Sequence, residues 1–138
     1  MYYKNMKIVN LEGLLKKTKL DHKASIRRSC LFENKEISYH VAQISKQVNA
    51  HFHQSGDEIY QIIKGQELIY TGKVIFHNKK IIKINWQKPK TVKKDDVFNI
   101  PAGFAHCLKK INKNKLIITF FCPPEHLKND RFIVKNPF

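Results

Sequence analysis

Short apolar segments separated by turn residues run through almost the whole chain after residue 24, and this pattern constrains the fold most strongly. Between residues 36 and 45, for example, Ile37, Tyr39 and Val41 alternate with polar or small residues, which is the period of a half-buried strand. Helical and strand patterns do not alternate in the way that builds a parallel α/β sheet. The pattern therefore predicts an all-β sandwich or barrel. The predicted strands cover residues 25–32, 36–45, 58–64, 67–77, 81–87, 97–100, 105–111, 116–122 and 131–134.

The first 24 residues differ from the rest and are interpreted as an N-terminal lead-in. Asn10 is a candidate N-cap for a short helix carrying Leu11, Leu14 and Leu15, and the same segment is apolar enough to exchange with a second subunit. No linker, repeat or low-complexity stretch follows. The 138 residues are therefore predicted to form one domain, a β-barrel at 25–138 after the lead-in at 1–24.

The formal charge of +15, from 26 Lys and Arg against 11 Asp and Glu, suggests an anionic partner. Its distribution argues against nucleic acid, because only Arg27, Arg28 and Arg131 are arginines and most lysines fall at predicted turns. No apolar run has the roughly 18 residues that a membrane-spanning helix needs, and the first residues lack the apolar core of a signal peptide. The three cysteines have no CxxC spacing, which fits a reducing cytoplasm.

Two histidines at i and i+2, His51 and His53, lie on one face if this segment is a strand. A turn composition follows, and Glu58 then opens a new strand from which its carboxylate can reach back to the imidazoles. Far downstream, His106 follows a Pro-Ala-Gly turn on another strand. Three imidazoles and one carboxylate on adjoining strands suit Fe, Mn, Ni, Co or Zn as divalent ions.

Two segments carry a resemblance to a known family. Residues 51–58, HFHQSGDE, together with Gly65 resemble the first motif of the cupin superfamily, HxHx₄Ex₆G. Residues 95–106, DDVFNIPAGFAH, resemble the second motif, Gx₅PxGxxHx₃N. Three turn or edge positions depart from the family pattern: Ser45 and Asp95 replace glycines, and Lys110 replaces the closing Asn, with Asn112 two residues further on.

The resemblance implies a small single-domain cupin-like β-barrel, also described as a jelly roll or double-stranded β-helix. It also implies that His51, His53, Glu58 and His106 bind a divalent metal ion. Strand parity places Tyr60 inside with Glu58, which makes it a candidate proton donor or a core residue. Arg27 and Arg28 face opposite sides, so one of them is expected to point inward. The candidate catalytic residues are Tyr60, Arg27 and Tyr39.

The leading functional hypothesis is a metal-dependent enzyme, such as a dioxygenase, lyase, decarboxylase or isomerase, that acts on a small anionic metabolite. The first alternative is a metal- or metabolite-binding protein without turnover, for sensing or storage. The second is a nucleic-acid binder that uses its lysines, for which affinity would fall steeply with salt. Cupin-like barrels commonly pair through sheet edges or exchanged terminal strands, so we expect a homodimer.

Overall fold

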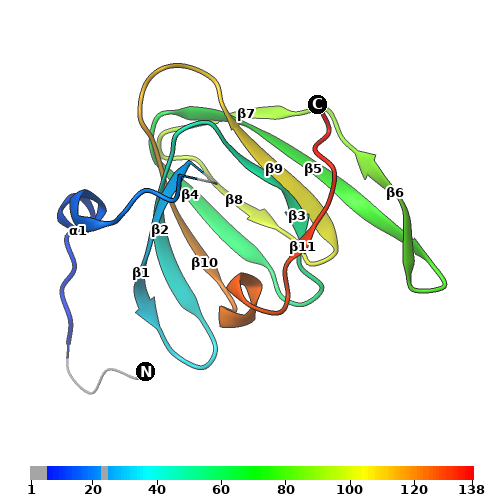
Figure 1. The fold of residues 1–138 in the computed structure, drawn as a ribbon, viewed down its shortest axis with the longest axis horizontal. Helices are drawn as coiled ribbons and strands as arrows, with labels where there is room; N and C mark the ends of the chain where they lie inside the picture. The colour runs from blue at the N-terminus through cyan, green and yellow to red at the C-terminus, as the bar shows by residue number, and fades with distance from the viewer. Residues whose placement is uncertain (1–5, 23–24) are drawn as a thin grey trace.

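Two antiparallel sheets face each other across the core (Figure 1). The computed structural model describes residues 6–22 and 25–138. The strands are β1 (Ile26–Glu33), β2 (Ser38–Ile44), β3 (Gln47–Phe52), β4 (Glu58–Lys64), β5 (Gln66–His77), β6 (Lys80–Trp86), β7 (Lys90–Lys93), β8 (Val97–Ile100), β9 (Phe104–Lys110), β10 (Leu116–Cys122) and β11 (Phe132–Ile133). One sheet has the order β1-β2-β10-β4-β8 and the other β11-β3-β9-β5-β6, with β7 also pairing with β5. This arrangement confirms the predicted all-β barrel.

The space between the sheets changes from apolar to polar along the strands, and this change positions the site. On β4 the inward side chains run from Ile62 through Tyr60 to Glu58, and on β9 from Leu108 to His106. The apolar end forms the main core, and Ile62 and Leu108 are completely buried in it. Polar groups are thus held on the same rigid strands that bury the core, a few residues further along.

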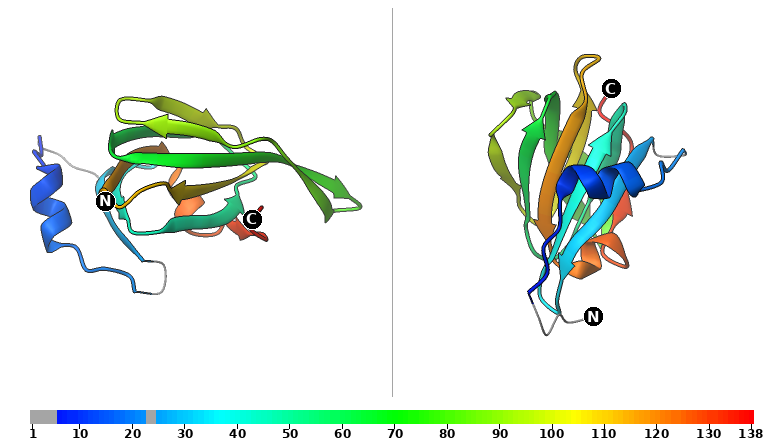
Figure 2. Two further views of the ribbon diagram at one scale, coloured as in Figure 1. Left: turned by 90° about the horizontal axis from the view of Figure 1, so that it is seen from above. Right: turned by 90° about the vertical axis from the view of Figure 1, so that its left-hand side faces the viewer.

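A short helix, α1 (Leu11–Lys17), lies outside the barrel next to β1 and β2 (Figure 2). The Asn10 side chain accepts a hydrogen bond of 2.8 Å from the backbone N–H of Gly13, which confirms the predicted N-cap. Leu15 is buried against Leu31 and Val41, so the helix covers the outer face of the sheet. Within residues 6–22 and 25–138, no helix has the length and apolar character needed to cross a membrane.

Three elements are missing from the predicted set: β3, β7 and a 3₁₀ helix. Strand β3 contains His51, for which the sequence offered a strand only as a condition. Strand β7 pairs with the first half of β5, while β6 pairs with the second half, so the long β5 holds two successive partners. The β5–β6 hairpin extends beyond the barrel (Figure 1). The 3₁₀ helix, η1 (Pro124–Leu127), follows β10 directly.

Asp95 stands where the cupin motif has a glycine, and its backbone adopts a conformation that glycine favours. Its φ is +76°, in the left-handed region that glycine tolerates best and Asp and Asn tolerate better than most residues. The Asp95 N–H donates to the carbonyl of Ile62 at 2.9 Å, which ties this turn to the end of β4. Asp95 therefore adopts a conformation that the glycine of the motif could also adopt.

Gly65 is expected to be the glycine least tolerant of substitution. Its φ is +92°, and a Cβ added there would lie 2.4 Å from the carbonyl oxygen of Lys115. Gly103 has a similar φ of +80°, but nothing lies within 4 Å of its added Cβ. Gly103→Ala should therefore cost only the left-handed penalty of about 1–2 kcal/mol, and Gly65→Ala should cost clearly more. Urea unfolding of the two variants measures the difference, and equal losses would contradict the steric argument.

Candidate metal centre

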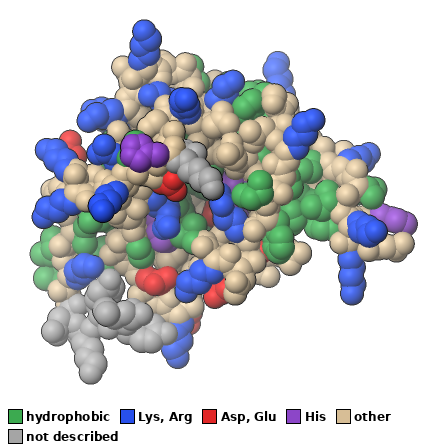
Figure 3. Space-filling model, in the orientation of Figure 1, with side chains coloured by type: hydrophobic (Ala, Val, Ile, Leu, Met, Phe, Trp, Pro, Cys, Tyr) green, Lys and Arg blue, Asp and Glu red, His purple; other side chains and the backbone are tan. Residues whose placement is uncertain are grey.

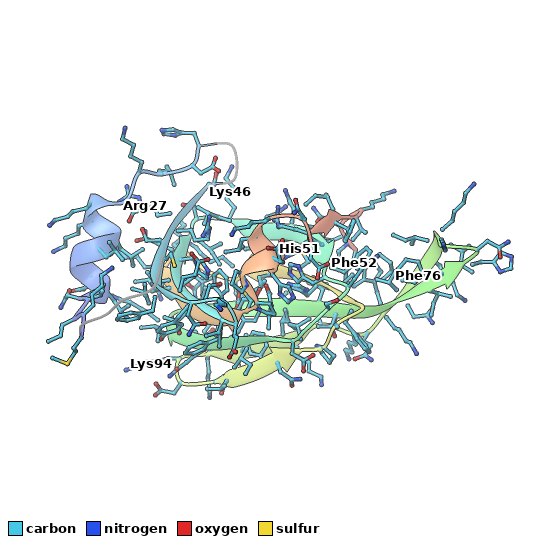
Figure 4. The ribbon with its side chains drawn as sticks, turned by 90° about the horizontal axis from the view of Figure 1, so that it is seen from below. Arg27, Lys46, His51, Phe52, Phe76 and Lys94 are labelled. Carbon is cyan, nitrogen blue, oxygen red and sulfur yellow. The ribbon has the colours of Figure 1, made fainter. Side chains whose placement is uncertain are left out.

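His51, His53, Glu58 and His106 converge on one point between the sheets. His51 lies on β3, His53 just beyond its end, Glu58 at the start of β4 and His106 on β9. One ligand atom from each residue lies within 4.8 Å of the corresponding atoms of the other three, and all four side chains are buried. Figure 4 shows His51 in the middle of the molecule, between the two sheets. The structure thus brings together all four residues that the two sequence motifs singled out.

Backbone carbonyls fix the orientation of all three imidazoles. His51 Nδ1 lies 2.8 Å from the carbonyl oxygen of Asn49, His53 Nδ1 2.5 Å from that of Asp130, and His106 Nδ1 3.4 Å from that of Phe104. Because a carbonyl oxygen only accepts, each Nδ1 must carry the proton and donate it. Each Nε2 is therefore the ring atom left for a metal ion, which is the orientation of histidines that bind metals.

The spacing of the acceptor atoms fits a divalent ion. Glu58 Oε1 lies 3.0 Å from His53 Nε2, and Glu58 Oε2 lies 3.4 Å from His106 Nε2. His53 Nε2 is buried and has no hydrogen-bond partner in the described part of the chain. Two ligand atoms that each lie about 2.1 Å from an ion are about 3.0 Å apart at a right angle and about 3.4 Å apart at a tetrahedral angle. The three imidazoles and the carboxylate can therefore hold a metal ion.

The electrostatics of the cluster also favour a cation. Burial by itself raises the pKa of Glu58, but contacts with His106, His126 and His53 outweigh burial and hold that pKa well below its usual value. Burial and the neighbouring His106 lower the pKa of His51 well below its usual value. At neutral pH the cluster therefore presents an anionic carboxylate next to a neutral imidazole.

Tyr60 holds the carboxylate in place. Its hydroxyl donates to Glu58 Oε2 at 2.7 Å, and its ring stacks on Phe98 with the ring centres 5.3 Å apart. Burial and the Glu58 carboxylate raise the pKa of Tyr60 well above its usual value, so the hydroxyl keeps its proton. Its contact with Glu58 makes Tyr60 a residue that orients a ligand, and its place in the barrel interior agrees with the strand parity read from the sequence.

Tyr60→Phe is expected to weaken metal binding by about 10- to 100-fold, the usual cost of removing a partner of a metal ligand. The ring and its stacking on Phe98 remain, so the fold should persist. Competition with a coloured chelator measures the affinity. Tyr39→Phe is the matched control, because Tyr39 stacks on Phe121 outside the barrel at 4.0 Å between ring centres. Equal affinities for the two variants would contradict a role for the Tyr60 hydroxyl.

A cavity of about 440 Å³ lies beside the cluster. His51, Glu58 and Tyr60 form part of its wall, and Ile118 and Phe120 supply apolar surface. Three cationic side chains also line it, against a single further carboxylate: Lys19, Arg28 and Arg131, with Asp21. The cavity can therefore receive a small molecule with at least one negative group.

Arg28 is anchored by a directed chain of hydrogen bonds. Its guanidinium lies 3.1 Å from His40 Nδ1, His40 Nε2 lies 2.9 Å from Ser38 Oγ, and Ser38 Oγ donates to the carbonyl of Cys122 at 3.1 Å. Burial and Arg28 lower the pKa of His40 to about 4, so its ring is neutral at pH 7 and accepts from Arg28. The bond to His40 uses one of the five donors of the guanidinium and leaves the others for a ligand.

Two candidate catalytic residues lie outside this cavity. Arg27 pairs with Gln43 and alternates with Arg28 along β1, so Arg28 is the arginine that faces the cavity. Tyr39 packs on the outer face with the cluster that contains Leu15. No sequence motif marks His40 or His126. Only the fold brings His40 to Arg28 and stacks the His126 ring on His53 at 3.9 Å between centres.

The basic side chains are scattered over the surface and form no single stripe on the face shown in Figure 3. Three of them, Lys19, Arg28 and Arg131, line the cavity beside the cluster. This distribution favours a small anion over a nucleic-acid backbone.

Known proteins resemble this chain in fold. No protein-family model matches the sequence, and no curated protein matches it significantly. A conserved protein with a double-stranded β-helix domain from Klebsiella pneumoniae superposes with a TM-score of 0.67 at 14% identity, covering 96% of this chain and 100% of that one. KdgF from Halomonas sp. gives a TM-score of 0.57 at 14% identity, covering 77% and 84%. The oxalate decarboxylase of Lactobacillus farciminis gives 0.58 at 15% identity, covering 78% of this chain and 31% of that one.

The chain therefore has the cupin fold, as the two sequence motifs implied. Within that fold it carries a buried cluster of three histidines and one glutamate that could bind a metal ion.

Proposed function

We propose that this protein is a metal-dependent enzyme that acts on a small anionic metabolite. One observation carries the proposal: a buried cluster of three imidazoles and a carboxylate forms part of the wall of a cavity that Lys19, Arg28 and Arg131 also line. A site for a cation and a site for an anion thus share one cavity.

A bound divalent ion would supply Lewis-acid polarisation of a substrate oxygen, or redox chemistry if the ion were iron. His51, His53, Glu58 and His106 would hold the ion. Arg28, steadied by His40, would bind the acidic group of the substrate and set its orientation. Tyr60 keeps the Glu58 carboxylate fixed, and the apolar surface of Ile118 and Phe120 limits water around the bound molecule.

The similar structures support a small acid as the substrate class. One of them is an oxalate decarboxylase in complex with formate. Both names denote small carboxylate anions, which is the chemistry that an arginine fork binds best.

The test is elemental analysis of protein purified without chelators or an affinity tag, followed by screening of small carboxylic and phosphorylated acids with and without oxygen. We expect at least one transition-metal ion per chain, and turnover of at least one of the acids. Metal and acid binding without turnover would support the binding-protein alternative instead. Binding of nucleic acid that falls steeply with salt, without metal, would overturn the proposal.

Arg28→Ala is expected to weaken binding of an acidic ligand by about 10-fold or more, because a hydrogen bond to a charged group contributes about 1.5–3 kcal/mol. Metal content should not change. Arg27→Ala is the matched control, since it removes the same charge from the neighbouring position outside the cavity. Calorimetric titration with the acid found by screening measures both variants, and equal losses would show that net charge, not Arg28, attracts the ligand.

We also propose that the protein is a cytoplasmic homodimer. The apolar lead-in and C-terminal tail prompted this expectation, although β11 pairs with β3 of its own chain. Exposed apolar side chains of the β5–β6 hairpin and the tail, among them Ile82 and Ile133, offer a surface for a second copy. Sedimentation at micromolar concentration tests the oligomeric state independently of the site.

A further inference from the structure

We propose that Glu58, Cys122 and His126 form a second metal site, which shares the Glu58 carboxylate with the three-histidine centre. One atom from each of these residues lies within 4.8 Å of the others, and the three side chains are between 0% and 2% exposed. The donors are a carboxylate, a thiolate and an imidazole, a set suited to Zn²⁺ or a similar divalent ion.

His126 turns Nδ1 toward the Glu58 carboxylate. Its Nε2 donates to the carbonyl oxygen of Ser55, which only accepts. Nδ1 is buried, has no hydrogen-bond partner in the described residues, and lies 3.6 Å from Glu58 Oε1. Burial by itself lowers the pKa of His126, but contacts with Cys122, Glu58 and Ser55 outweigh burial and raise that pKa to about 10, so in the metal-free protein the ring is a cation. A metal ion bound to Nδ1 would take the place of that proton as the positive charge facing the buried carboxylate.

The separation of the two facing atoms leaves room for an ion. A hydrogen bond between nitrogen and oxygen spans about 2.7–3.2 Å, which is shorter than the 3.6 Å between Nδ1 and Oε1. Two ligands about 2.1 Å from a tetrahedral ion are about 3.4 Å apart, close to the observed value.

The local structure holds this arrangement in place. Cys122 is the last residue of β10, and η1 begins two residues later and carries His126. The His126 ring is parallel to that of His53, with 2° between the planes. Gly56 permits the close approach of this segment, because a Cβ at that position would lie 2.6 Å from Pro123 Cγ. The second set of donors is therefore positioned by packing on the turn that joins β3 to β4.

The two oxygens of Glu58 face different partners. Oε2 accepts from Tyr60 and lies near His106, whereas Oε1 lies between His53 Nε2 and His126 Nδ1. The carboxylate can thus connect two ions. Cys122 would bind as the thiolate and release its proton to solvent, so loading of the second site is coupled to proton release.

The test is cobalt loading of reduced, metal-free protein. We expect two Co²⁺ per wild-type chain, together with the near-ultraviolet absorption of a thiolate bound to cobalt. Cys122→Ser should hold one ion and lose this absorption. His126→Gln should also hold one ion. Cys107→Ser is the matched control, because this buried thiol lies on the far side of β9, next to Asn136, and should leave both ions and the absorption in place.

His106→Ala separates this proposal from the proposed function, because it damages only the three-histidine centre. It should keep one ion and the thiolate absorption. One ion per wild-type chain without that absorption would overturn the second site and leave the first intact. One ion per wild-type chain together with the thiolate absorption would support the second site and remove the metal basis of the proposed enzyme. Circular dichroism of each variant confirms that loss of an ion is not loss of the fold.

Discussion

His106→Ala is expected to lower the affinity of the three-histidine centre for a divalent ion by more than about 100-fold. Removing a mere partner of a metal ligand costs about 10- to 100-fold, and His106 is the only member of this cluster that the second motif contributes. Glu58→Gln should weaken binding less, since it keeps the shape of the side chain and one oxygen donor but removes the negative charge. Chelator competition in a Cys122→Ser background reports this centre alone.

His77→Ala serves as the control, because His77 is an exposed histidine on the projecting β5–β6 hairpin. The His77→Ala variant should bind the metal with the same affinity as the Cys122→Ser protein from which it is made. If His106→Ala and Glu58→Gln also matched the parent, the ion would lie elsewhere, and the two motifs would not form one centre.

Glu67→Gln is expected to remove a large pH dependence of stability. Glu67 is completely buried, alternates along β5 with the core residue Ile69, and neither of its carboxylate oxygens has a hydrogen-bond partner in the described part of the chain. Burial raises the pKa of Glu67 from 4.5 to about 8. The folded protein therefore keeps the proton on Glu67 over a pH range in which the unfolded chain has lost it.

The direction in which the unfolding free energy changes with pH follows from this difference in proton binding. Below about pH 4.5 both states are protonated, and Glu67 does not oppose folding. Between about pH 4.5 and pH 8 the unfolding free energy falls with rising pH, by up to about 5 kcal/mol at 1.36 kcal/mol per pH unit, and above pH 8 it levels off. The Gln variant has no such proton to lose, so its stability relative to the wild type should rise across this range.

Urea unfolding at several pH values between 4.5 and 9 measures the effect as the difference between the variant and the wild type. That difference cancels the contributions of Glu58 and the histidines. Glu36→Gln is the control, because Glu36 is exposed between β1 and β2. A difference that did not change with pH would mean that the folded protein solvates or pairs the Glu67 carboxylate.

Local patterns were enough to predict most of the strands, and two motifs that resemble those of the cupins singled out the four residues of the cluster. The period-two alternation that specifies a half-buried strand is written in neighbouring residues, and β4, β8 and β10 have the predicted limits. The spacing of His51, His53 and Glu58 is equally local. Strand β7 escaped prediction because it is only four residues long and follows Pro89, so its sequence shows no alternation, and its pairing with β5 is a tertiary contact.

The sequence by itself determined that this chain forms an all-β barrel, because the alternation of a strand depends on short-range periodicity. It also singled out the residues of the histidine–glutamate cluster, because two motifs, one with His51, His53 and Glu58 and the other with His106, resemble those of the cupins. Only the tertiary structure decided that Arg28 faces the cavity, since the inward face of β1 depends on its pairing with β2 and not on β1 alone. It also decided that His126 meets Glu58. Glu58 and His126 are far apart in the chain. The segment after β10 brings His126 to Glu58 by packing against the loop before β4, and no local sequence pattern marks this contact.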